Sequence, residues 1–318
     1  MFIESFKVTG GAVFQIFLLA AIGFFLVKIK FLGDEGLDAL SRLTMDVTLP
    51  ILIFYQLVKD FTFAKYPGWW ALPLISIALT AVGLLFGFLF SFFITGRQHK
   101  MQFLSLVTFQ NSGYLPLALV AALLTGEQLG TMFIYLFLLL TGFNLVMFSL
   151  GVYMLSFQKD KKFEPASLLS APVVATVISL VFIVLGLNKF MPEAVMKPLQ
   201  LTGQCTLPLA MLVVGGNLAQ INLKRIDTRS MSLALLAKMV VLPFIGLWFI
   251  LTFQVPYLIG LLVLIQLAMP SAVTLSVIIR NYKKEDLLIS QGILLSHIMS
   301  IITIPLFLIL YFSLVVIK

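Results

Sequence analysis

The sequence predicts an all-α polytopic membrane protein, and three observations lead to this fold class. Of the 318 residues, 61% are hydrophobic and only 11% are charged, which is too little charge to coat a water-soluble fold. The apolar residues occur in windows of about 20, the length that an α-helix needs to cross the hydrocarbon of a bilayer. The motif L-T-x-x-x-T-L-P occurs twice, at Leu43–Pro50 and at Leu201–Pro208. We therefore expect two related halves within the membrane.

Ten membrane-crossing helices are predicted along the chain. They cover residues 11–28, 36–58, 69–95, 102–124, 131–156, 166–187, 195–219, 231–253, 257–279 and 289–316. The two motif copies fall in the second and seventh helices, so the repeat unit is five helices, with one repeat at 1–158 and the other at 159–318. Because five is an odd number, the second repeat enters the membrane from the opposite side. The two repeats are therefore expected to be inverted.

The distribution of lysine and arginine predicts the orientation. The loops after the odd-numbered helices carry 14 of the 21 basic residues, and the opposite side carries 6. Because cytoplasmic loops are enriched in basic residues, we expect a multi-pass protein of the cell (plasma) membrane with both termini on the non-cytoplasmic side. The net charge of +8 is explained by these loops, so no nucleic-acid partner is expected beside the lipid bilayer.

The fourth predicted helix, 102–124, contains a helix-breaking run. Gln110, Asn111 and Ser112 precede a glycine, and Pro116 follows it. Glycine lowers helix propensity, and proline removes a backbone donor and clashes with the preceding turn. In hydrocarbon the freed carbonyl groups need partners, so the break is expected against other protein or a wet cavity.

The ninth predicted helix, 257–279, is interrupted in the same way. Pro270 is followed by Ser271, and Thr274 comes shortly after. The N–H groups that begin a half-helix lack intrahelical acceptors and carry about half a positive charge. Inverted repeats bring two such starts together from opposite faces, which favours a carboxylate at the crossing point. Simple proline kinks are the alternative interpretation.

Few charged residues are expected deep in the membrane, namely Asp46 near the centre of the second predicted helix and Lys238 within the eighth. Lys238 is a candidate partner for a substrate carboxylate, and its alternative is a lysine whose amine reaches the cytoplasmic surface. Asp46 is a candidate for proton coupling, and its alternative is a structural hydrogen bond. His297 is expected to be a packing histidine.

Three segments resemble the auxin efflux carrier family, which includes plant auxin exporters and bacterial malate and malonate permeases. These segments are Leu43–Phe54, Gln110–Leu119 and Met269–Val273. The resemblance implies a homodimeric, elevator-type carrier of organic anions. In such a carrier helices 1, 2, 6 and 7 form the scaffold, and helices 3–5 and 8–10 form the transport domain. The loop at 157–165 is short, unlike the long cytoplasmic loop of the plant exporters, so a bacterial-type permease is expected.

The breaks and the resemblance together assign a set of residues to substrate binding. These are Gln110, Asn111, Ser112, Pro116, Leu117, Pro270, Ser271, Ala272, Thr274 and Lys238. The expected substrate is a small mono- or dicarboxylate such as malate or malonate. The second break lacks an asparagine beside its proline, and a serine stands there instead.

The same residues bear on other functions. A cation/proton antiporter needs clustered intramembrane acids, which the sequence does not offer at the breaks. A sodium- or proton-coupled anion symporter of another inverted-repeat family and a non-transporting membrane sensor are the alternatives that stay open. An enzyme is not expected, because no nucleophile–base or metal-ligand motif is present in the sequence, and neither a metal nor a cofactor is expected.

Overall fold

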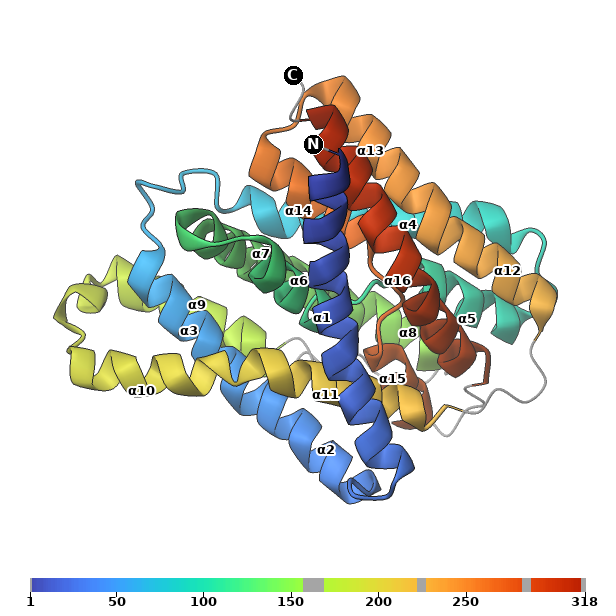
Figure 1. The fold of residues 1–318 in the computed structure, drawn as a ribbon, viewed down its shortest axis with the longest axis horizontal. Coiled ribbons are helices and arrows are strands. Elements are labelled where there is room, and N and C mark those ends of the chain that lie inside the picture. Colours follow the sequence, from blue (N-terminus) through green and yellow to red (C-terminus); the bar gives the residue numbers. More distant parts are fainter. Residues whose placement is uncertain (1, 157–168, 222–226, 282–286, 316–318) are drawn as a thin grey trace.

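The computed structural model describes residues 2–156, 169–221, 227–281 and 287–315 (Figure 1). These residues form helices joined by short loops, and they contain no β-strand. The loop at 157–165, which separates the two predicted repeats, lies outside the described residues. The all-α fold that the sequence predicts is confirmed.

The first half of the chain contains seven α-helices of more than eight residues. They are α1 (Phe2–Lys28), α2 (Asp34–Arg42), α3 (Leu49–Asp60), α4 (Ala71–Ser91), α5 (Arg97–Thr108), α6 (Tyr114–Leu123) and α7 (Gly126–Val146). A π-helical turn, η1 (Leu43–Thr48), joins α2 to α3, and a second one, η2 (Met147–Gly151), leads from α7 into the short helix α8 (Val152–Ser156).

The second half has the same general composition. Its helices are α9 (Ala171–Val184), α10 (Glu193–Gln204), α11 (Thr206–Ala219), α12 (Thr228–Leu236), α13 (Leu242–Phe253), α14 (Tyr257–Ala268), α15 (Thr274–Asn281) and α16 (Leu287–Val315). A 3-10 turn, η4 (Leu187–Phe190), lies between α9 and α10, and the π-helical turn η5 (Ala237–Val241) lies between α12 and α13.

Six helical stretches of the described chain are long and apolar enough to cross a membrane. They are Thr9–Lys28, Ala71–Ser91, Gly126–Leu155, Glu193–Ala219, Thr228–Phe253 and Leu287–Val315. Three further apolar helices, α6, α9 and α14, are shorter. The segment predicted at 36–58 is a continuous helical run through α2, η1 and α3. A multi-pass membrane protein is thus confirmed, and the number of ten crossings stays a prediction.

Each copy of the repeated motif disturbs its helix. The first copy forms the π-helical turn η1, and Pro50 stands in the first turn of α3. The second copy divides α10 from α11 at Cys205, and Pro208 stands in the first turn of α11. Proline lacks an N–H and clashes with the preceding turn, so neither helix continues with regular α-helical bonds. The motif therefore marks a local irregularity in both halves, a π-helical turn in the first and a break between two helices in the second.

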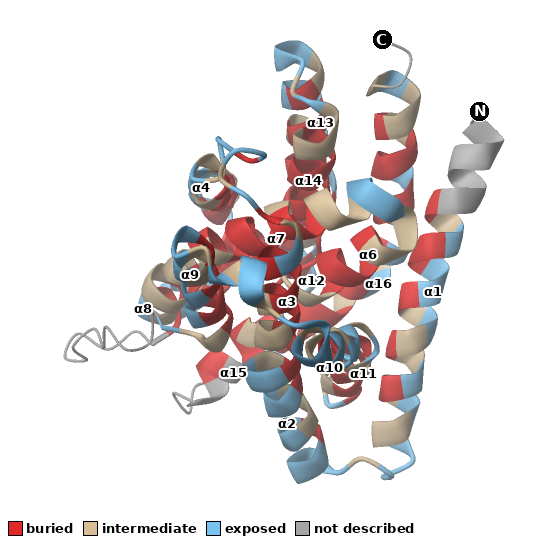
Figure 2. Ribbon diagram, turned by 90° about the vertical axis from the view of Figure 1, so that its left-hand side faces the viewer, coloured by how far each residue is buried: buried red, intermediate tan, exposed pale blue. Residues whose placement is uncertain are grey.

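Close helix contacts hold α1 against α11. A Cβ atom placed on Gly215 would lie 1.7 Å from the carbonyl oxygen of Ala20, so only glycine allows the two backbones to approach this far. Helix α1 also packs against α6 and α16, whereas α3 packs against α9 and α10. The start of α1 and the end of α16 lie at the same end of the molecule (Figures 1 and 2). This is the arrangement that an even number of crossings produces.

The centre of the molecule is apolar and formed largely by α7 and α14. Most residues of both helices are buried, and Figure 2 shows α7 surrounded by other helices. Large apolar side chains are exposed on the outer helices, for example Phe14 and Phe25 on α1 and Phe244 on α13. Exposed apolar residues of this size are expected where a protein surface meets lipid rather than water.

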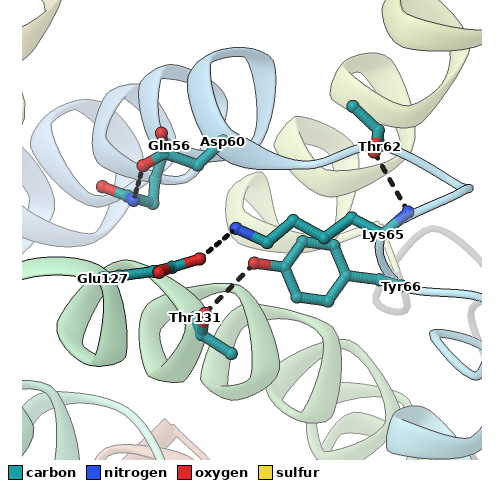
Figure 3. Close-up of polar contacts among 7 residues, drawn as sticks. All are labelled: Gln56, Asp60, Thr62, Lys65, Tyr66, Glu127 and Thr131. Carbon is teal, nitrogen blue, oxygen red and sulfur yellow. Dashed lines mark hydrogen bonds and ion pairs between the residues drawn. The ribbon is translucent and has the colours of Figure 1, made fainter.

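The loop between α3 and α4 is attached to the start of α7 by polar contacts (Figure 3). The Lys65 amine lies 2.9 Å from the Glu127 carboxylate, and the hydroxyls of Tyr66 and Thr131 are 3.2 Å apart. The salt bridge is exposed and therefore contributes little to stability. The aromatic ring of Tyr66, however, is buried and stacks on Phe61. The packing of this ring therefore fixes the loop, and the polar contacts set its register on α7.

Candidate functional site

The interruptions in the fourth and ninth predicted helices lie side by side. Helix α5 ends at Thr108 and α6 begins at Tyr114, while α14 ends at Ala268 and α15 begins at Thr274. Between them the two extended segments pair as an isolated antiparallel bridge. The Asn111 N–H donates to the Pro270 carbonyl at 2.8 Å, and the Ala272 N–H donates to the Phe109 carbonyl at 3.0 Å. These reciprocal bonds satisfy backbone groups that each break would otherwise leave without partners.

A cavity of about 150 Å³ adjoins this crossing. Its polar wall includes Gln110, Asn111, Ser112 and Thr274, together with the first residues of α6. The opposite wall comes from the end of α2, from η1 and α3, and from α7, α9 and α11. Its residues are Ser41, Met45, Leu49, Leu140, Phe143, Asn144, Pro172, Val213, Val214 and Asn217. The lining residues carry no formal charge, so any attraction for an ion comes from dipoles.

Several buried polar side-chain atoms at the crossing have no hydrogen-bond partner. Among the described residues, these atoms are Thr108 Oγ1, Gln110 Nε2, Ser112 Oγ, Tyr114 Oη and Gln266 Oε1, and two further ones, on Ser76 and Thr206, lie outside the crossing. Leaving a buried polar group without a partner costs about 1–3 kcal/mol. Three of these atoms, on Gln110, Ser112 and Tyr114, belong to residues that line the cavity, which indicates that these side chains bind something there.

Helix α16 contacts both broken segments. The Ser271 N–H donates to Ser296 Oγ at 3.1 Å, and the amide nitrogen of Asn111 lies 3.5 Å from His297 Nε2. The Ser271 hydroxyl also donates to the Leu106 carbonyl at 2.8 Å. The crossing is therefore held from one side by adjacent residues of a single helix.

Lys238 lies in the π-helical turn η5 and is buried. Its amine donates to the Val107 carbonyl, at 3.0 Å, in the last turn of α5. The alternative in which Lys238 reaches the membrane surface is therefore wrong. Lys238 is absent from the cavity wall, so its amine contacts the end of α5 rather than the space where a substrate fits. The last carbonyl groups of a helix lack intrahelical donors, so an N–H donor is well placed there.

Asp46 lies in η1, and its side chain is exposed in the single chain. A role for Asp46 in proton coupling stays a prediction. The neighbouring Met45, in the same π-helical turn, lines the cavity. Asp46 remains close enough to Tyr114, in the first turn of α6, to interact with it electrostatically.

The structure brings most predicted binding residues to the crossing, but only some of them to the cavity. Gln110, Asn111, Ser112, Ala272 and Thr274 line the cavity. The other predicted residues are Pro116, Leu117, Pro270, Ser271 and Lys238, which lie behind the wall and support it.

Sequence reasoning missed three contributors to this site. His297, expected to be a packing residue, contacts Asn111. Asn144 and Asn217, from α7 and α11, line the cavity opposite the crossing. An asparagine within an apolar helix is the signal that could have identified the last two, since polar side chains in membrane helices face the protein interior or a cavity.

Comparison with known proteins relates this chain to membrane transport proteins. A family model described as Membrane transport protein matches residues 9–167 and 156–308, which together cover most of the chain. The chain is also 30% identical over 113 residues to an uncharacterized transporter, C5D6.04, of Schizosaccharomyces pombe. That match covers 35% of this chain and 25% of the yeast protein.

Proposed function

This chain belongs to the membrane transport protein family, the auxin efflux carrier family that its sequence resembles, and we propose that it carries small organic anions across the membrane. Family membership also identifies the chain as a transporter rather than an enzyme. The proposed substrates are mono- or dicarboxylates such as malate or malonate. The observation that carries the proposal is the group of unpartnered polar atoms at the crossing of two half-helices.

The electrostatics of the crossing favour an anion over a cation. Helices α6 and α15 both begin at the cavity, where Tyr114 and Thr274 are lining residues. A helix start carries about half a positive charge and offers N–H donors. The side chains of Asn111 and Ser112 add further donors in the same wall. A carboxylate accepts hydrogen bonds only, so it matches this set of donors.

The size of the cavity supports a small acid. A volume near 150 Å³ accepts a molecule of about benzene's size, which has six non-hydrogen atoms. Malonate and malate are slightly larger, and the side chains of Met45 and Leu49 are flexible enough to make additional room. A large conjugate or a peptide would not fit without a major rearrangement.

The proposed mechanism is elevator-type alternating access by two inverted five-helix repeats. Two observations support the repeats. First, α1 packs on α11 in the same way that α3 packs on α9, which pairs the first helix of each repeat with the second helix of the other. Second, the two breaks form an antiparallel bridge with reciprocal hydrogen bonds, as a two-fold axis in the membrane plane requires.

The cavity lies between the two proposed domains. Its crossing wall and the residues from α7 fall in the proposed transport domain, whereas those from α2, η1, α3, α9 and α11 fall in the proposed scaffold. A carrier that moves its site past a fixed scaffold needs the substrate at this boundary. We further propose a homodimer assembled through the scaffold, in the plasma membrane, with both termini on the non-cytoplasmic side.

A binding and uptake experiment tests the proposal. Purified protein is heated with acetate, benzoate, malonate, malate or citrate, because a ligand that prefers the folded state raises the melting temperature. Acids that stabilise the protein are then tested for uptake into proteoliposomes. The variant Asn111→Ala is expected to lose both effects, whereas Asn188→Ala, in η4 away from the cavity, keeps them. If no acid stabilises the protein and none is taken up, the proposal is wrong.

A further inference from the structure

His297 is buried on α16 and makes two polar contacts that are chemically dependent on each other. Its Nδ1 lies 2.8 Å from the Ile293 carbonyl oxygen, and its Nε2 lies 3.5 Å from Asn111 Nδ2. The remaining surface of the residue borders an apolar cavity lined in part by Phe17 and Phe24 of α1. These surroundings give the ring two polar directions, one toward its own helix and one toward the crossing.

The hydrogen-bond roles follow from the partners. A carbonyl oxygen can only accept, so Nδ1 must carry the proton and donate to Ile293. In the neutral ring Nε2 is then an acceptor, and only the amide NH₂ of Asn111 can satisfy it. The contact at the other end of the Asn111 amide is consistent with this orientation, because Oδ1 lies 3.5 Å from the Leu115 nitrogen and accepts a hydrogen bond from its N–H.

This orientation decides what Asn111 offers to the cavity. An amide NH₂ has two N–H donors. One points to His297, and the second is available to a carboxylate in the cavity that Asn111 lines. If the amide were turned over, its oxygen would take the place of the NH₂ group and repel a carboxylate. Nothing in the shape of an amide prevents this, because its two ends are nearly the same size.

We infer that His297 is the positioning residue that fixes Asn111 with its donor end toward the bound carboxylate. The inference rests on the proposed anion-binding function of the crossing. His297 acts through Asn111 and does not itself line the cavity. The neighbouring Ser296 holds the other broken segment through the Ser271 N–H, so α16 fixes both segments relative to each other.

Two substitutions of His297 separate positioning from packing. In His297→Gln the longer side chain places its amide where Nε2 stands, so it can still accept from Asn111. In His297→Asn the shorter side chain places its amide where Nδ1 stands, so it keeps the Ile293 contact and loses Asn111. Affinity is measured by thermal shift with acetate, benzoate, malonate, malate and citrate, and KM by uptake of the acids that bind. We expect His297→Asn to weaken binding about tenfold and His297→Gln to stay within about threefold of wild type.

A double-mutant cycle with Asn111→Ala distinguishes the outcomes. If His297 acts through Asn111, His297→Asn causes no further loss of affinity in the Asn111→Ala background. A further tenfold loss there, or equal losses for His297→Asn and His297→Gln, overturns the positioning role. If Asn111→Ala alone leaves binding unchanged, the proposed function of the crossing fails instead. If none of the five acids raises the melting temperature of the wild-type protein, both the proposed function and the positioning role are wrong.

The His297 variants could fail to fold, so a second measurement uses protein in which the site is not substituted. Nitrogen NMR of histidine-labelled protein reports which ring nitrogen carries the proton, and the exposed His99 is assigned with His99→Gln. The inference requires the form of His297 protonated at Nδ1. A ring protonated at Nε2 would present a donor to Asn111 and would overturn it.

Discussion

The contact between α1 and α11 permits a sharp test of the scaffold, because it depends on a missing side chain. In Gly215→Ala the added Cβ would lie 1.7 Å from the Ala20 carbonyl oxygen and 2.9 Å from the Phe24 nitrogen. Both are backbone atoms of a regular helix, so they cannot rotate away. The helices must separate by about 1.5 Å, and overpacking of this kind costs about 1–3 kcal/mol.

The measurement is the free energy of unfolding of purified protein in detergent. Gly11→Ala provides a matched control, because Gly11 is on α1 and nothing lies within 4 Å of its added Cβ. In a helix, alanine is favoured over glycine by up to about 1 kcal/mol, so the control is expected to be neutral or stabilising. If Gly215→Ala is as stable as Gly11→Ala, the close packing of α1 on α11 described above is wrong.

Three further predictions address transport and stability. Lys238→Met removes the donor to the Val107 carbonyl at the end of α5, and uptake of the acids that bind is expected to fall roughly tenfold. Wild-type uptake by the folded variant would contradict this prediction. Asp46→Asn is expected to abolish any dependence of uptake on a pH gradient, and an unchanged dependence rejects proton coupling through this residue. Asp227→Ala removes the acceptor for the Ser230 hydroxyl and N–H at the start of α12, which is expected to cost about 1 kcal/mol in the free energy of unfolding. The Ser230 hydrogen bonds lower the pKa of Asp227 below its ordinary value of 3.8, so the stabilisation is fully present at neutral pH. It is lost as the pH falls through the lowered pKa. The free energies of unfolding of the wild type and of Asp227→Ala should therefore converge in acid.

The helical class and the two interrupted helices could be predicted from the sequence, because both follow from local composition. The first break lies within the predicted run, because the chain leaves the helix between Phe109 and Gly113 and Pro116 stands in the first turn of α6. Pairing with the other broken segment holds this stretch extended. The individual residue pairs of this bridge could not be predicted, because no pattern within one segment reveals which residue of the other segment it contacts.

The contacts that complete the site were beyond sequence reasoning for the same reason. Lys238 reaches Val107 across 131 positions, and His297 reaches Asn111 across 186. The sequence identified Lys238 as costly to bury but could not distinguish a backbone carbonyl from a substrate as its partner.

The bridge between Phe109–Asn111 and Pro270–Ala272 is made by main-chain atoms alone. Two side chains at these positions add contacts of their own, Asn111 to His297 and the Leu115 N–H, and Ser271 to the Leu106 carbonyl. The side chains of Gln110 and Ser112 take no part in the bridge. A protein engineer could therefore randomise Gln110 and Ser112 to seek new cargo while the architecture persists.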